Sequence, residues 1–239
     1  MKIFDCHLHI EKGLKDYDLG SVTKSNVIFN EIETYEKFID KVKPSDSVAL
    51  VFDVKNFDFV VDQHKKKRIN ALKIISRDQK LTQRDYDFIQ EKLPLFSDDV
   101  VVIIDAFYYG AELLFQPSLT EIIRTAVNFP NKKIVVAHCG GHKVLDYFLH
   151  LRQLPNIYYD LSLSLQYLYD SSTFLDLIKL INYTPKEKIM FGTDYYWASP
   201  KKQYQILNEI FDRLSVAASE REMILYQNAE DLLKNKQIR

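Results

Sequence analysis

The sequence is short of the features that mark secreted, membrane-bound or nucleic-acid-binding proteins. Two cysteines in 239 residues are too few for a disulfide framework, which fits a reducing compartment. The net charge of −1 and the pI near 6.6 give no electrostatic reason to bind nucleic acid or an anionic membrane. No apolar run is long enough to span a bilayer, and no pattern typical of a secretion signal is present. We therefore expect a soluble, cytoplasmic protein with no nucleic-acid or membrane partner.

Linkers and repeats are also missing. The chain has only 6 glycines, no low-complexity stretch, no short-period repeat and no Gly/Ser-rich segment. Its hydrophobic content of 46% is ample for a large core. A length of 239 residues suits one barrel or two small domains, and we interpret residues 1–239 as a single barrel domain.

A strand followed by an amphipathic helix recurs along the chain, about every 30 residues, as in a (β/α)₈ barrel. The strands are apolar on both faces, as in Val-Ala-Leu-Val-Phe at 48–52, which is typical of buried parallel strands. The predicted fold is therefore an α/β TIM barrel with a C-terminal helix near 220–235. The predicted strands are 2–9, 26–30, 47–54, 69–75, 100–106, 133–138, 156–160 and 188–193. The predicted helices between them are 34–43, 58–66, 84–93, 117–128, 142–151, 172–181 and 201–214.

The first strand ends in His7-Leu8-His9. Because side chains alternate along a strand, the two histidines are expected on one face with Ile3 and Asp5. The same alternation turns Cys6 away from that face. Two imidazoles at one strand end supply half of the ligands for a divalent transition metal, although two solvated histidines at an exposed strand end would give the same pattern.

Three later strands also end in polar residues. The strand at 133–138 ends in His138, the one at 156–160 leads to Asp160 and Ser162, and the one at 188–193 is followed by Asp194. A parallel barrel gathers its chemistry at the C-terminal ends of its strands. The sequence therefore predicts that these side chains meet His7 and His9 at one face.

Four segments together resemble the metal-dependent amidohydrolase superfamily, and most closely the amidohydrolase-related (amidohydrolase-2) group, which includes aminocarboxymuconate-semialdehyde decarboxylase. They are Asp-Cys-His-Leu-His at 5–9, Ala-His-Cys-Gly-Gly at 137–141, Phe-Gly-Thr-Asp-Tyr at 191–195 and Tyr-Gln-Asn-Ala at 226–229. The resemblance implies a barrel with one divalent metal at its C-terminal face, zinc first and manganese as the alternative. His7 and His9 would ligate it. Asp194 would ligate it or move a proton, and His138 would ligate it or bind water or substrate.

The sequence departs from this pattern at the fifth strand, where the family has a histidine. The strand Val-Val-Ile-Ile-Asp at 101–105 ends in Asp105, in phase with Val101 and Ile103. Either Asp105 replaces the histidine as a ligand or the site has decayed, and we favour replacement because carboxylates bind zinc and manganese. An added carboxylate makes the site less positive, which lowers the pKa of a bound water less and favours harder ions.

Five further residues are candidates for substrate binding. Lys73 is expected on the fourth strand, as a substrate-contacting or structural group rather than the carbamylated, metal-bridging lysine of some superfamily members. Arg77 at the end of that strand could clamp a carboxylate, or lie on the surface. Aromatic residues after the fifth and eighth strands suit a planar or sugar-like substrate, or ordinary packing; these are Tyr108, Tyr195 and Trp197.

The leading functional hypothesis is a metal-dependent hydrolase that uses an activated water on an amide, lactone or ester of a small molecule. Asp194 would accept the proton of this water and pass it to the leaving group. Three alternatives remain. The first is a metal-dependent, non-oxidative decarboxylase on the same scaffold. The second is a metal-dependent phosphoesterase of the related nuclease type, which would usually need an additional glutamate ligand and a basic mouth that are not apparent. The third is a catalytically degenerate barrel that only binds a ligand or partner. The sequence leaves the oligomeric state open, and a homodimer is common for this architecture by analogy alone.

Overall fold

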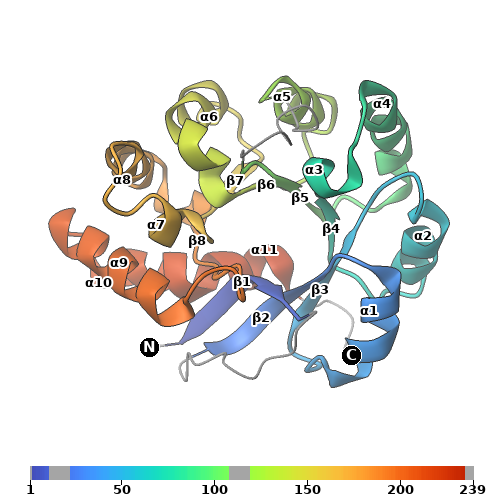
Figure 1. The fold of residues 1–239 in the computed structure, drawn as a ribbon, viewed down its shortest axis with the longest axis horizontal. Helices are drawn as coiled ribbons and strands as arrows, with labels where there is room; N and C mark the ends of the chain where they lie inside the picture. Colours follow the sequence, from blue (N-terminus) through green and yellow to red (C-terminus); the bar gives the residue numbers. More distant parts are fainter. Residues whose placement is uncertain (1, 11–21, 108–118, 235–239) are drawn as a thin grey trace.

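The computed structural model describes residues 2–10, 22–107 and 119–234. Eight parallel strands run around a central barrel in chain order, with helices outside them (Figure 1). This confirms the predicted TIM barrel, and every predicted strand has its counterpart. The strands are β1 (Ile3–His9), β2 (Val22–Phe29), β3 (Ser47–Val51), β4 (Ala71–Ile74), β5 (Val101–Asp105), β6 (Ile134–Ala137), β7 (Ile157–Asp160) and β8 (Ile189–Met190).

Closure between β8 and β1 depends on a few backbone contacts, because β8 is only two residues long. The Cys6 amide donates to the carbonyl of Phe191 at 3.0 Å, and the His9 amide donates to the carbonyl of Tyr195 at 3.2 Å. Leu8 and Tyr195 form an isolated parallel bridge. The segment after β8 is thereby fixed against the histidine-bearing end of β1.

The helices cover the outside of the barrel. Their local signals are visible in the sequence: Ser199 caps α9 and Pro200 follows it at the first helical position, while Thr82 and Asp85 form a capping box on α4. The major helices are α1 (Ile32–Phe38), α2 (Phe57–Lys65), α4 (Gln83–Lys92), α5 (Leu119–Asn128), α6 (Val144–Leu151), α8 (Thr173–Tyr183) and α9 (Pro200–Arg213).

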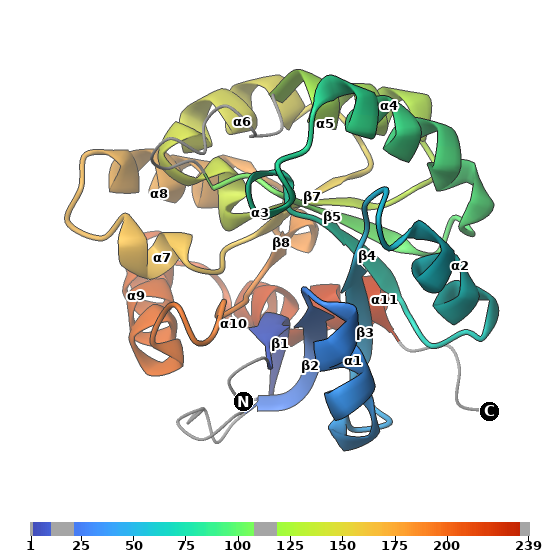
Figure 2. The same ribbon diagram turned by 45° about the vertical axis from the view of Figure 1, so that its right-hand side comes forward.

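Two short helices are additional to the prediction. They are α3 (Ser76–Gln79), directly after β4, and α7 (Ser164–Tyr167), after β7. Figure 2 shows α7 beside α9, and the two helices are in contact. The predicted terminal helix is divided into α10 (Ala218–Glu222), a π-helical turn (Met223–Gln227) and α11 (Asn228–Leu233).

The barrel interior holds a small apolar cluster distinct from the larger layer between strands and helices. Its strand residues are Phe4, Cys6, Ile28, Ala49, Ala71, Val101, Ile103, Val135, Ala137 and Met190. Ala229 and Leu233 of α11 belong to the same cluster, and α11 packs against β1 and β8. Asn228, the first residue of α11, donates hydrogen bonds to the carbonyls of Lys186 and Ile189, just before and at the start of β8, so α11 covers the N-terminal end of the barrel.

The simple alternation predicted for β1 is wrong. Ile3 lies in the outer cluster, whereas Phe4 and Cys6 lie inside the barrel. The pairing of β1 with β2 shifts between Asp5 and Leu8, and such an irregularity adds a residue and changes which face later side chains occupy. Cys6 therefore lies under the site, and the expectation that it turns away is corrected.

Among the described residues, no helix is both long and apolar enough to cross a membrane.

Candidate active site

Two histidines from β1 and one aspartate after β8 converge at the C-terminal end of the barrel. Nε2 of His7 lies 3.4 Å from Oδ1 of Asp194, and Nε2 of His9 lies 3.3 Å from the same oxygen. All three side chains are buried. The three atoms belong to a group of potential metal ligands that lie within 4.8 Å of one another.

The opposite edge of the His7 ring is held by the end of β7. Nδ1 of His7 lies 2.5 Å from Oδ2 of Asp160, and the Ser162 hydroxyl lies 3.2 Å from the same nitrogen. Asp160 also accepts hydrogen bonds from the backbone amide and the hydroxyl of Ser162, at 2.7 and 2.8 Å. A protonated Nδ1 that donates to Asp160 leaves the lone pair of Nε2 directed at Asp194, which is the arrangement a metal ligand needs.

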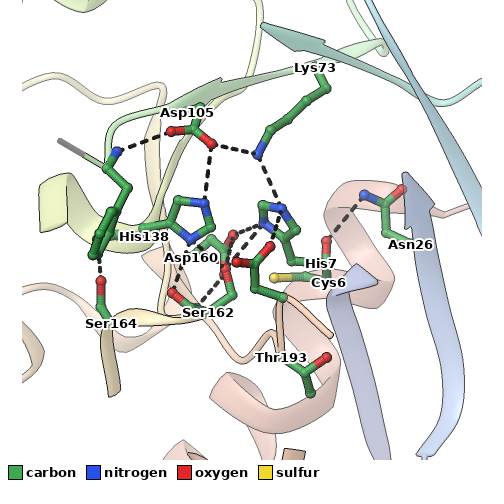
Figure 3. Close-up of polar contacts among 12 residues, drawn as sticks. Cys6, His7, Asn26, Lys73, Asp105, His138, Asp160, Ser162, Ser164 and Thr193 are labelled. Atoms are coloured by element: carbon green, nitrogen blue, oxygen red, sulfur yellow. Dashed lines mark hydrogen bonds and ion pairs between the residues drawn. The ribbon is translucent and has the colours of Figure 1, made fainter. Parts of the chain in front are cut away.

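A second polar group lies next to the first (Figure 3). Oδ2 of Asp105 is 3.3 Å from Nε2 of His138 and 3.7 Å from Nζ of Lys73. Lys73 is fully buried, and its Nζ lies 3.1 Å from Nε2 of His7. The lysine therefore links Asp105 to the first group, and Asp105 faces the interior as its phase with Val101 and Ile103 predicted.

The backbone around these side chains is unusually constrained. Asp194, His138 and Leu163 all have φ between 53° and 59°. Residues other than glycine rarely adopt this left-handed backbone conformation. Asp5 anchors the loop that carries Asp194, because it accepts hydrogen bonds from the amide and hydroxyl of Thr193 at 2.9 and 2.6 Å. These contacts fix the position of the Asp194 carboxylate relative to β1.

Gly192 allows β1, β7 and β8 to approach one another closely. A Cβ atom at this position would lie 2.7 Å from Oδ1 of Asp160, 2.9 Å from Cβ of His7 and 3.0 Å from Sγ of Cys6. Any larger residue would push Asp160 and His7 apart. The glycine of the Phe-Gly-Thr-Asp segment thus has a packing role directly beneath the site.

Burial and charge set the protonation of the site. Burial, reinforced by the nearby Lys73 ammonium, lowers the pKa of His7 to about 4, so its imidazole is neutral at pH 7. Burial opposes ionisation of Asp160 and Asp194, but the adjacent histidines outweigh it. They lower the pKa of Asp160 to about 2 and hold that of Asp194 below its usual range. Burial opposes protonation of His138, yet Asp194 and Asp105 raise its pKa.

These properties fit a divalent transition metal. His9, the neutral His7 and the ionised Asp194 present two nitrogens and one oxygen to a common point, a donor set used for zinc and manganese. The other nearby group, His7, His138 and Asp160, suits a metal less well because Asp160 already accepts three hydrogen bonds. Asp105, predicted as a ligand, belongs to neither of these groups; it lies beside His138 and Lys73 instead.

A cavity of about 460 Å³ opens above these residues. Of the predicted substrate contacts, Trp197 lines it, whereas Tyr195 is buried and is not part of its described lining. Lys73 lies deeper, against His7 and Asp105. The side chain of Arg77 and the whole of Tyr108 fall outside the described residues.

Several residues of this region were not predicted. Asn30, Phe107 and Tyr167 line the cavity, and Asp5 orients the Asp194 loop. Asn30 directly follows β2 and Phe107 is the second residue after β5, so their place near strand ends was a usable signal. Tyr167 lies on α7, and nothing in the local sequence pattern indicated that helix.

Comparison with known proteins agrees with the family resemblance of the sequence. The family described as Amidohydrolase (Amidohydro_2) matches residues 76–234, and the chain therefore belongs to the amidohydrolase family. This family is generally metal-dependent, as the histidine and aspartate groups of the site lead one to expect. No curated protein matches the chain.

Similar solved structures include a TIM-barrel protein, Bb4693, from Bordetella bronchiseptica, with a TM-score of 0.68, 17% identity and 98% of each chain covered. Dihydroorotase from Campylobacter jejuni has a TM-score of 0.66 and 15% identity, covering 96% of this chain and 82% of its own. A 2,6-dihydroxybenzoate decarboxylase from Rhizobium has a TM-score of 0.62 and 13% identity, with 98% of each chain covered. At these identities the likeness establishes the fold alone.

Proposed function

We propose that the protein is a metal-dependent hydrolase of a small molecule with an amide, lactone or ester bond. The observation that carries the proposal is the convergence of His7 Nε2 and His9 Nε2 on Asp194 Oδ1, at 3.4 and 3.3 Å. This cluster lies below a cavity of about 460 Å³, a size typical of small-molecule sites.

His7, His9 and Asp194 would hold the ion, with Asp105 as a further carboxylate in place of the family's histidine. A bound divalent ion supplies Lewis acidity and lowers the pKa of an adjacent water. Zinc is the first choice for two imidazoles and a carboxylate, and the added charge of Asp105 makes manganese the alternative.

Asp194 would move the proton. Its carboxylate is ionised at neutral pH because the surrounding histidines hold its pKa down, and it lines the cavity. It would take the proton of the attacking water as the new carbon–oxygen bond forms. It would return that proton to the leaving nitrogen or oxygen as the old bond breaks.

His138 would hold the substrate or the attacking water. Its Nδ1 lies near the hydroxyl and the carbonyl of Ser162, at 3.0 and 3.1 Å. Its Nε2 faces Asp105. Asp194 and Asp105 raise the pKa of His138. Its Nε2 would donate to an oxygen of the substrate or water in place of Asp105.

The test is a screen of amide, lactone and ester substrates with zinc- or manganese-loaded protein, with products identified by mass spectrometry. For the best substrate we expect Asp194→Asn to lower kcat by about 10²–10⁴-fold without changing the thermal unfolding midpoint by more than a few degrees. Asp231→Asn is the matched control, since Asp231 is exposed on α11 at the other end of the barrel.

The alternatives appear as distinct outcomes of this screen. Release of carbon dioxide from an aromatic or enoic acid, without hydrolysis, would replace the proposal by a decarboxylase. Full activity of Asp194→Asn would remove the role given to that carboxylate. Absence of retained metal under every loading condition would leave a ligand-binding barrel.

A further inference from the structure

The cavity above the site is walled by exposed aromatic rings. Tyr167 is 61% exposed and Trp197 is 65% exposed, and both line it. Only one other aromatic residue of the described chain is comparably exposed, Tyr183 on α8 at 67%. Large rings left in water beside a cavity are typical of surfaces that contact a ligand.

Both rings are supported from behind. Tyr167 packs edge-to-face on Phe107, with ring centroids 4.8 Å apart. Phe107 in turn packs against the ring of His138, at 5.9 Å. Trp197 lies against Tyr196, at 5.1 Å and an interplanar angle of 32°. Rings held by neighbours lose little freedom on binding, so they can contribute affinity for a flat ligand.

A polar group in the same cavity suggests what else the ligand carries. Asn30 lines the cavity directly after β2, and its Oδ1 is buried with no hydrogen-bond partner among the described residues. Buried amide oxygens are nearly always paired in proteins. This oxygen is closed to solvent as it stands, so an N–H or O–H of a bound ligand would satisfy it once the Asn30 side chain turns toward the cavity.

We infer that the substrate is a planar ring compound with an N–H donor on or beside the ring, bound against Tyr167 and Trp197 and hydrogen-bonded to Asn30. The inference deepens the proposed function, because it narrows the amide, lactone or ester class to a flat amide. The aromatic walls select the ring, and Asn30 favours an amide over the corresponding ester.

Trp197 supplies the measurement, since it is the only tryptophan of the chain. Zinc-loaded full-length protein is titrated with benzamide and cyclohexanecarboxamide, which share a carboxamide but differ in ring planarity, while tryptophan fluorescence is recorded. We expect benzamide to change the fluorescence and to bind about fivefold more tightly than the saturated analogue. Methyl benzoate, which has no N–H donor, should also bind more weakly than benzamide.

Two variants assign these preferences to residues. Tyr167→Ala should remove most of the preference for the flat ring, whereas Tyr183→Ala, the matched exposed tyrosine, should keep it. Asn30→Ala should reduce the preference for benzamide over methyl benzoate about fivefold or more. Asn182→Ala, at an exposed position on α8, is its control.

Equal affinities for benzamide and cyclohexanecarboxamide would overturn the inference, as would binding detected by calorimetry without any change in Trp197 fluorescence. Its failure is separable from that of the hydrolase proposal. Hydrolysis of a saturated, non-planar amide would keep the hydrolase and remove the planar substrate. Ring-selective binding without hydrolysis of any substrate would keep the planar ligand and remove the hydrolase.

Discussion

The two ends of the barrel interior are built on opposite principles. At the N-terminal end, Phe4 of β1 and Val101 of β5 pack with Leu233 of α11 and form an apolar plug. At the C-terminal end, the same strands bury ionisable groups: His7, His9, Lys73, Asp105, His138, Asp160 and Asp194. Burial of apolar side chains stabilises the fold, whereas buried charges cost free energy unless they are paired. The comparison shows that the plug end carries stability and the other end carries chemistry, as barrels of this type arrange them.

The backbone is also constrained at the polar end. Of the eight described non-glycine residues with left-handed φ, four lie in loops that directly follow barrel strands at this end, namely His138, Cys139, Leu163 and Asp194, and the other four lie elsewhere in the fold. Such conformations persist only where surrounding contacts hold them. The hydrogen bonds of Asp5 to Thr193 provide such contacts for Asp194.

The largest expected effect is a loss of stability on substitution of a residue in the apolar plug. Leu233→Ala should lower the free energy of unfolding by about 2–5 kcal/mol, because it leaves a cavity at a buried position. Metal affinity of the folded variant should stay unchanged. Urea unfolding and a chelator-competition titration measure the two quantities, with the exposed Leu95→Ala as control. A plug variant that loses metal affinity while still folded would contradict the division.

A smaller effect is expected from the support of His7. Asp160→Asn should weaken metal binding about 10–100-fold, because it removes the carboxylate that orients the His7 ring. The same competition titration measures it, with Asp176→Asn on α8 as control. Unchanged affinity would show that Asp160 does not orient the ligand.

This variant also gives a pH dependence. The pKa of Asp160 is lowered from 3.8 to about 2 in the folded protein, so its ionised form stabilises the fold above about pH 4. That contribution is lost as the pH falls from about 4 to about 2. The stability difference between the wild type and Asp160→Asn should therefore shrink over this range in acid urea titrations.

The smallest effect concerns Lys73. Its ammonium lies 3.1 Å from Nε2 of His7 and 3.7 Å from Asp105, where it opposes a second cation. Lys73→Met should raise metal affinity about tenfold by removing that repulsion, as measured by competition with a chromophoric chelator. The contrary result is loss of metal binding in Lys73→Met, together with an intact mass that shows a carboxylate added to the Lys73 amine of the wild type. It would make a carbamylated Lys73 a metal ligand.

Much of this arrangement could be predicted from the sequence, because strand periodicity and strand ends are local properties. The eight strands and the interior position of Asp105 followed from apolar runs and their phase. The position of Cys6 did not, since the irregularity of β1 arises from its pairing with β2. The link from Lys73 to His7 joins residues 66 positions apart, and only the closed barrel brings them into contact.

The central claim is that His7, His9 and Asp194 form a working metal site although Asp105 stands in place of the family's histidine. It is tested most directly by elemental mass spectrometry on protein purified without chelator and after incubation with zinc or manganese. We predict about one equivalent of metal in the wild type and in His150→Ala, an exposed histidine of α6, and loss of that metal in His7→Ala. No retained metal in the wild type, or equal metal in His7→Ala, would contradict the account.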